Sequence, residues 1–351
     1  MSQRIGILGF AHGHVHAYCS QWRQHFAHDV QVVAGWDHDA ARLDKKAAEH
    51  GIEACASPDD VLAKVDAVVI AAETSLHAEL VEQAAAAGKT IVLQKPMALT
   101  LGEADRMVAA VERHGVPFTM AWQMRVDPQN VEIKRLIESG VVGRVVMVRR
   151  RHGLATQYMF DGKFGQSWHA SPKFNRGMWA DDASHAIDFL LWLLGEPLSV
   201  MAEIDTLVDP TVPDDQGIAI YRYADGKFAE VVSSFTCAAG ENTTEIVGER
   251  GTIIQNYGDA PSCNIARPEG GIALKWYTRA DGKWTISDLP APANHGERIA
   301  NLAGPLAEFV CGKRGPIATV DEGRTALRMT LACYQSAAEG RRINMNEVTY
   351  G

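Results

Sequence analysis

Residues Ile5 to Tyr18 read IGILGFAHGHVHAY, and this stretch decides the fold of the first part of the chain. An apolar run leads into a glycine turn and then into a helical pattern. Dinucleotide binding needs this order, because glycine lets the backbone approach a pyrophosphate and a helix start supplies unpaired amides. Gly9, Ala11 and Gly13 replace a strict G-x-G-x-x-G pattern, with the last interval one residue short, so a purely structural turn remains an alternative. The expected cofactor contacts in this turn are Gly9, Phe10, Ala11, His12, Gly13 and His14.

Apolar, strand-like runs alternate with helical patterns as far as Trp122. Six strands with five intervening helices are typical of an α/β domain in which helices cover both faces of a doubly wound parallel sheet. After Trp122 the pattern changes to β-runs and turns, with ADGK at 224–227 and again at 280–283 as hairpin signals. The sequence therefore predicts a first domain over residues 1–122 and an α+β domain with a mainly antiparallel sheet over 123–351. Helices in the second part are expected at Pro128–Ser139, Asp181–Leu194, Ala303–Cys311 and Asp321–Glu339.

The composition argues against several classes of protein. The chain has 34 basic and 43 acidic residues, a net charge of −9, and its acids are spread out, so we expect no nucleic-acid partner. The N-terminus lacks the features of a signal peptide, and no run approaches the ~20 apolar residues that cross a bilayer. Six cysteines lie far apart without a C-x-x-C pair. We expect a cytoplasmic protein with reduced cysteines and no membrane partner.

Asp37 stands at the end of the second expected strand, 28 residues after Gly9. A carboxylate at this place can accept hydrogen bonds from both hydroxyls of an adenosine ribose, whereas a phosphate on that ribose would meet a like charge. The sequence therefore favours NAD over NADP, although His38 or a more distant basic side chain could adapt the site to NADP. The alternative interpretation makes Asp37 a solvated turn residue.

Histidines 12, 14 and 16 raise a second possibility, because an H-x-H pair after a first strand can bind a divalent metal in barrel hydrolases. Such a site needs further ligands at later strand ends. His77 is the one further strand-end histidine before residue 150, and the sequence lacks eight strand–helix units. We therefore expect no metal, and expect the histidines to line the helix start and the diphosphate.

Residues 179–197, WADDASHAIDFLLWLLGEP, have helical periodicity with an apolar face between residues 187 and 194. Asp181, His185 and Asp188 lie at i, i+4 and i+7 on another stripe. Two carboxylates on either side of an imidazole orient the ring and raise its pKa, which would make His185 a better base near neutrality. An isolated Asp/His pair with this spacing is more often structural.

Lys95 follows the apolar strand TIVLQ and precedes Pro96. At the carboxyl edge of a parallel sheet its amine can project into the crevice where ligands bind, and the proline biases Lys95 away from helix. A cation there can hydrogen-bond a substrate hydroxyl and stabilise the negative charge that develops on oxygen as hydride leaves the carbon. Lys95 and His185 together suit the oxidation of an alcohol.

The order of these motifs resembles the Gfo/Idh/MocA family of oxidoreductases, over essentially the whole chain. The resemblance rests on the glycine turn, the acid after strand two, ETSLH at 73–77, QKP at 94–96, MRVDP at 124–128 and D-x-x-x-H-x-x-D at 181–188. It continues in EIVGERGTI at 245–253, the segment 305–327 and ACYQSAAEGRR at 332–342. It implies a Rossmann domain followed by a domain with an open-faced sheet that often forms homodimers or homotetramers. The implied substrates are sugars, inositols and their derivatives.

Roles for individual residues also follow from this resemblance. Lys95 matches the lysine of the E-K-P motif, His185 the proposed base and Asp181 the acid before it. The cofactor contacts that the resemblance adds are Glu73, Thr74, His77, Gln94 and Lys95. The substrate contacts that it adds to Lys95, Asp181 and His185 are Arg125, Trp168, His169 and Lys173.

Three positions depart from the family pattern. Gln94 stands where a glutamate is usual, which removes an anion that could hold or tune the amine of Lys95. The glycine turn is one residue short, which changes the detailed diphosphate contacts. Ala183 stands where a glycine is common two residues before His185, a mild change.

The working hypothesis is an NAD-dependent dehydrogenase, with NADP possible, that oxidises a secondary alcohol of a sugar or cyclic polyol. One alternative is a glycoside-processing enzyme in which bound NAD oxidises the sugar transiently and takes part in no net redox. Another is a regulator that senses a sugar or dinucleotide without chemistry, and a metal hydrolase is the least favoured.

Overall fold

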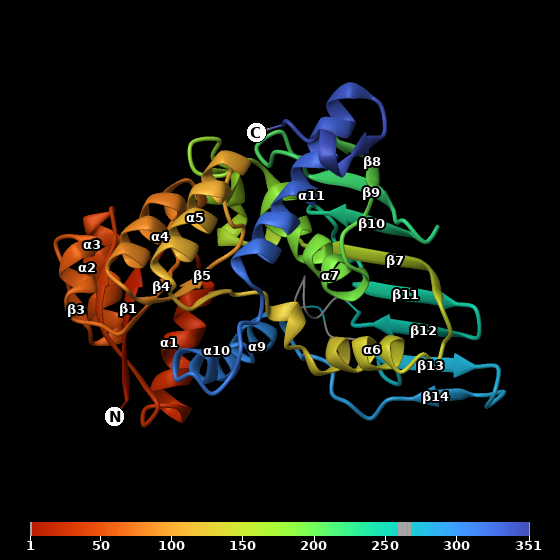
Figure 1. The fold of residues 1–351 in the computed structure, drawn as a ribbon, viewed down its shortest axis with the longest axis horizontal. Helices are drawn as coiled ribbons and strands as arrows, with labels where there is room; N and C mark the ends of the chain where they lie inside the picture. Colours follow the sequence, from red (N-terminus) through yellow and green to blue (C-terminus); the bar gives the residue numbers. More distant parts are fainter. Residues whose placement is uncertain (1, 259–264, 266–267, 351) are drawn as a thin grey trace.

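A six-stranded parallel sheet forms the first part of the computed structural model, which describes residues 2–258, 265 and 268–350 (Figure 1). Its strand order is β3-β2-β1-β4-β5-β6, so the chain starts in the middle of the sheet and winds outward in both directions. This confirms the predicted doubly wound α/β domain. The strands are β1 (Gln3–Leu8), β2 (Val30–Trp36), β3 (Glu53–Ala54), β4 (Ala67–Ile70), β5 (Thr90–Leu93) and β6 (Phe118–Met120).

Helices cover both faces of this sheet. On one face α4 packs against α3 and α5, and on the other α1 packs against α9 and α10 from the end of the chain (Figure 1). Local sequence explains where they start: Ser57 caps α3 ahead of Pro58, and Thr100 and Glu103 form a capping box on α5. The helices are α1 (His14–His25), α2 (Ala40–His50), α3 (Pro58–Leu62), α4 (His77–Ala86), α5 (Leu101–His114), α9 (His295–Ala300) and α10 (Ala303–Val310).

A nine-stranded sheet forms the second part, with the order β14-β13-β12-β11-β7-β10-β9-β8-β15. Adjacent strands of this sheet are antiparallel, except that β7 and β10 are parallel. The sheet is therefore mixed and mainly antiparallel, as predicted. The two ADGK segments join β9 to β10 and β13 to β14, which confirms both hairpins. The strands are β7 (Val145–Gly153), β8 (Ser199–Asp205), β9 (Gln216–Arg222), β10 (Phe228–Ser234), β11 (Thr243–Gly248), β12 (Gly251–Asn256), β13 (Leu274–Thr278), β14 (Trp284–Ile286) and β15 (Ile343–Asn344).

The second part also contains three helices: α6 (Pro128–Glu138), α7 (Ser184–Leu194) and α11 (Val320–Glu339). The long helix α11 lies between the two sheets and contacts α5, α7 and β8 (Figure 1). A π-helical turn, Trp179–Ala183, directly precedes α7. Because the end of the chain packs on both domains, the two are closely joined, and the predicted boundary after Trp122 stays a prediction.

The structure bears on two expectations from the sequence: that no segment spans a membrane and that the cysteines are reduced. Among the described residues, no helix has the length and apolar character that crossing a bilayer requires. Cys19, Cys55, Cys311 and Cys333 are free thiols. Cys263 lies outside the described residues.

Candidate active site

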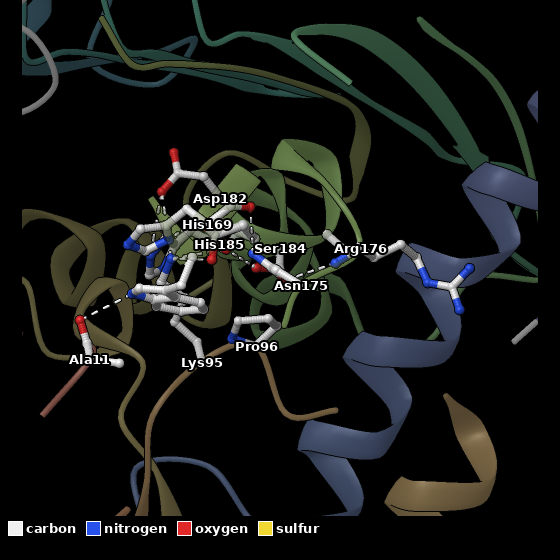
Figure 2. A network of polar contacts seen from close by, with 12 residues as sticks. Ala11, Lys95, Pro96, His169, Asn175, Arg176, Asp182, Ser184 and His185 are labelled. Atoms are coloured by element: carbon white, nitrogen blue, oxygen red, sulfur yellow. Dashed lines mark hydrogen bonds and ion pairs between the residues drawn. The ribbon is translucent and has the colours of Figure 1, made fainter. Parts of the chain in front are cut away.

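Lys95 lies at the end of β5 and reaches from the first domain into the second. Its side chain is buried, and its Nζ donates a hydrogen bond to the backbone oxygen of Asp181 at 2.9 Å. The same nitrogen lies 3.4 Å from Asp181 Oδ1 and 3.8 Å from Asp182 Oδ1. Lys95, Asp182, His169 and His185 lie together in one group at the junction of the domains (Figure 2). The amine therefore crosses the domain junction and has Asp181, in the segment that precedes α7, as its hydrogen-bond partner.

Asp181 joins Lys95 to the aromatic segment around Trp168. The Nδ1 atom of His169 lies 2.8 Å from Asp181 Oδ2. Burial opposes ionisation of Asp181, but the charges of Lys95 and His169 outweigh it and lower the pKa of this carboxyl. Trp168 stacks on His169 with ring centroids 3.9 Å apart, and its Nε1 donates to the backbone oxygen of Ala11 at 3.1 Å. The structure thus brings the predicted Trp168 and His169 against both the carboxylate and the glycine turn.

Asp182 organises the histidines of the site. Its Oδ2 lies 2.9 Å from His152 Nε2, and its Oδ1 lies 3.8 Å from His185 Nε2. The Gln123 Nε2 atom is 3.4 Å from the same nitrogen of His185. Asp182, His152 and Gln123 were not predicted as site residues. Asp182 adjoins Asp181 in the sequence, but spacing alone could not tell which carboxylate faces the histidine.

The predicted stripe of Asp181, His185 and Asp188 is wrong in two respects. Asp181 bonds Lys95 and His169, and Asp188 bonds Arg125, so Asp182 is the carboxylate nearest His185. The reason is the π-helical turn Trp179–Ala183, whose extra residue shifts the side chains that precede α7 relative to an unbroken α-helix. The predicted rise in the pKa of His185 is also wrong. Burial lowers this pKa well below 6.5, and the charge of Lys95 lowers it further against the opposing effect of Asp182.

Arg125 and Lys173 were predicted to contact the substrate, but both have other partners in the structure. Arg125 is buried with its guanidinium bonded to Asp188 at 2.7 Å and Glu322 at 2.6 Å. These ion pairs tie α7 and α11 together and occupy its donors, because a buried guanidinium needs carboxylate partners. Lys173 is exposed, with Nζ 4.7 Å from the centre of the Phe174 ring. Neither side chain has a contact with Lys95 or His185 among the described residues.

Asp37 lies buried at the carboxyl edge of the first sheet, so its interpretation as a solvated turn residue is wrong. It accepts hydrogen bonds from the Phe10 amide at 2.7 Å and from the Arg42 guanidinium at 2.7 Å. Arg42 also pairs with Glu73 at 2.9 Å, and Glu73 lies 3.0 Å from His38. Asp37 and Glu73, from two separate segments, therefore meet around one arginine at the place expected for an adenosine ribose.

The glycine turn leaves no room for a side chain at Gly9 and is open at Gly13. Gly9 has φ of 87°, and a Cβ there would lie 2.3 Å from the Ala72 backbone, so no other residue fits. A Cβ on Gly13 would meet nothing within 4 Å, and α1 begins there without a side-chain cap. The amides of Val15 and His16 donate to the His12 and Gly13 oxygens at 3.3 and 3.2 Å, so the start of α1 is closed by backbone bonds and not by a side chain. Near this turn, the hydroxyl of Thr74 and both ring nitrogens of His12 are buried and have no hydrogen-bond partner among the described residues.

His77 and Gln94 have structural partners. The ring nitrogens of His77 lie 3.0 Å from the Pro96 oxygen and 3.1 Å from the Ala72 oxygen, so this histidine supports the turn that carries Lys95. It is buried, and both nitrogens are engaged, which argues against the predicted cofactor contact. Gln94 donates from Nε2 to the Tyr18 hydroxyl at 2.9 Å, while its Oε1 has no partner among the described residues.

Two family models match this chain. A model described as the oxidoreductase family with an NAD-binding Rossmann fold matches residues 3–122, and the GFO/IDH/MocA C-terminal domain matches residues 130–254. The chain therefore belongs to the Gfo/Idh/MocA family, and it is an NAD-binding oxidoreductase. These findings confirm the predicted family, the Rossmann domain, the cofactor and the class of enzyme.

Individual relatives cover nearly the whole chain. Inositol 2-dehydrogenase of Rhizobium meliloti (strain 1021) is 28% identical over 360 residues, which covers 98% of this chain and 100% of that protein. The WlbA dehydrogenase of Bordetella pertussis, solved with NADH and UDP-GlcNAcA, has 26% identity and a TM-score of 0.79 over 98% of this chain and 97% of that one. An oxidoreductase of Agrobacterium radiobacter, solved with NAD+, L-tartaric acid and magnesium, shares the fold with a TM-score of 0.83 and 21% identity over 99% of each chain.

The buried histidines predict how stability depends on pH. Burial is the main cause that lowers the pKa values of His12, His14, His152 and His185. Below about pH 6.5 the unfolded chain binds protons at these positions that the folded chain does not, so the free energy of unfolding falls as pH falls. We expect a loss of at least about 2 kcal/mol between pH 7.5 and 5.5 in urea denaturation. His185→Asn should make the loss smaller by up to about 1.4 kcal/mol over this interval, whereas equal stability at both pH values would contradict neutral burial.

Proposed function

We propose that this protein oxidises a secondary alcohol of a sugar or cyclic polyol reversibly, with NAD as the hydride acceptor. The observation that carries the proposal is the meeting of Lys95 and His185, from different domains, around the carboxylates of Asp181 and Asp182. The names of relatives such as inositol 2-dehydrogenase support a polyol substrate.

The residues for the cofactor follow from the edge of the first sheet. Gly9 and the start of α1 would receive the diphosphate, and Asp37 with Glu73 would hold the adenosine ribose. Both oxygens of Asp37 already accept from Arg42, so Arg42 has to shift when ribose hydroxyls bind. When bound, the nicotinamide supplies the carbon that takes up the hydride.

In the proposed reaction His185 accepts the proton of the substrate hydroxyl. A neutral imidazole can do this near pH 7, and burial together with Lys95 lowers the pKa of His185, which keeps it neutral. Lys95 donates a hydrogen bond to the same oxygen and stabilises its developing negative charge. Asp181 and Asp182 offset the ammonium charge and fix its position, while Trp168 and His169 cover one side of the site.

Substitution of the amine tests the proposal. In Lys95→Met we expect kcat to fall at least about 100-fold, because the donor to the developing oxyanion is lost. NAD+ affinity should stay within about threefold, and Lys45→Met, on the exposed face of α2, should behave like the wild type. The measurement is NADH absorbance with inositols, aldoses, polyols and sugar acids as substrates. Near-normal turnover in Lys95→Met, or no NADH from the wild type with any of them, would refute the proposed function.

We also propose that a second copy of this chain covers the open face of the nine-stranded sheet, giving a homodimer or homotetramer. Ile218 and Ile220 of β9 are each 39% exposed, and Met201 of β8, paired opposite Ile220, is 41% exposed. Adjacent exposed apolar side chains of this kind are typical of association surfaces.

Sedimentation velocity tests the association. We expect the wild type to sediment as a dimer or tetramer and Ile220→Asp to shift toward monomer, since a charge on this face opposes its burial. Val131→Asp, at an exposed position on α6, is the matched control. A monomeric wild type, or an Ile220→Asp variant that associates as well as the control, would overturn this proposal.

A further inference from the structure

Unpartnered polar atoms gather around Lys95 and His185. Buried polar groups are nearly always hydrogen-bonded, so a cluster of exceptions points to a missing ligand. Among the described residues, the ring nitrogens of His12, the Nδ1 of His185 and the Nε1 of Trp122 have no partner. Arg298 is the charged member of this cluster, because its Nε and Nη1 also lack a partner.

Arg298 comes from the short helix α9, near the end of the chain, and is 4% exposed. Within the described part of the chain it has neither an ion pair nor a hydrogen bond from its guanidinium. Arg125, the comparable buried arginine, bonds two carboxylates. Burying a guanidinium without such partners lowers the free energy of unfolding by several kcal/mol. An anion that binds the guanidinium offsets this loss.

Arg298 lies on α9, which packs against α1, and His295 of the same helix has its ring centre 6.2 Å from that of His14 at the start of α1. Arg298 and Lys95 both lower the pKa values of His14 and His185, after the larger effect of burial, so each lies within electrostatic range of these two rings. Arg298 has the same effect on His152, whose Nε2 bonds Asp182. Arg298 of α9 and Lys95 after β5 are thus two buried cations that both act on the histidines of the site.

Two other charged groups lie near Arg298, and both are held elsewhere. Asp127 Oδ1 accepts from the Tyr257 hydroxyl and from the Gln129 amide at 3.0 Å, while its Oδ2 has no partner among the described residues. No ion pair joins Asp127 to Arg298 in the described part of the chain. Arg150, a second cation, donates to Thr244 at 2.8 Å, and burial lowers its pKa to about 10.

Resting on the proposed function, we propose that Arg298 binds a carboxylate of the substrate, which makes the substrate a sugar acid, aldonic or uronic. One guanidinium matches the single charge of a carboxylate, and the unpartnered imidazole and indole nitrogens nearby suit the hydroxyl groups of the same molecule. Lys95 is already neutralised by Asp181 and Asp182, which leaves Arg298 as the cation available to the substrate.

Matched pairs of compounds test this assignment. D-glucuronate and D-glucose, D-galacturonate and D-galactose, and D-gluconate and D-glucitol differ in one carboxylate. With NAD+ present, we expect at least one acid to have a KM about 10- to 100-fold below that of its neutral counterpart, the range of a charged hydrogen bond. Arg298→Gln should remove this preference through KM, Arg298→Lys should restore part of it, and the exposed Arg279→Gln should keep all of it.

A binding measurement separates this inference from the proposed dehydrogenation. Isothermal titration of the NAD+-loaded protein should give heat with the preferred acid and none in Arg298→Gln, provided that the variant melts like Arg279→Gln. Acid binding that depends on Arg298 without NADH formation would support the inference and refute the proposed function. If the neutral compounds are bound or turned over as well as the matching acids, or better, the inference is overturned. That result would indicate that water joins Arg298 to Asp127. Absence of binding by any acid would also overturn it.

Discussion

The hydrogen bond from Lys95 Nζ to Asp181 joins the two domains at the candidate active site. An ammonium buried in protein is stable only when carboxylates and carbonyl oxygens replace its water. Lys95 follows strand β5 of the first sheet by two residues, whereas Asp181 and Asp182 come from the π-helical turn before α7 in the second domain. The site therefore exists only when both domains are folded and docked, and α11, which packs on both, holds them in that arrangement.

The first domain was predictable in detail because its local signals agree with one another. Caps at Ser57 and Thr100, the apolar strands and the glycine turn at Gly9 each specify the same parallel sheet. Asp37 and Lys95 follow from this frame, since the carboxyl ends of parallel strands meet at one edge. The alternation of strands and helices in the sequence predicts the parallel sheet, and the sheet places Asp37 and Lys95 at the same edge.

The second half of the site was less predictable, for reasons that individual residues illustrate. Asp182 was missed because a one-residue π-helical shift changes which carboxylate meets His185, and no residue pattern marked that shift. Arg125 was assigned to substrate from the family resemblance, and its structural role was missed because its ion pairs with Asp188 and Glu322 join segments far apart in the sequence. Arg298 drew no prediction, since its importance lies in the absence of a partner, which only packing reveals.

The central claim is that Lys95 and Asp181 stabilise each other across the domain junction, and a double-mutant cycle on the free energy of unfolding tests it most directly. Lys95→Met and Asp181→Asn should each destabilise the protein by about 3–5 kcal/mol, because each removes one partner of a buried charged group. The double variant should lose at least about 1 kcal/mol less than the sum of the two. Additive losses, within about 0.5 kcal/mol, would show that the two groups do not interact and would contradict the account.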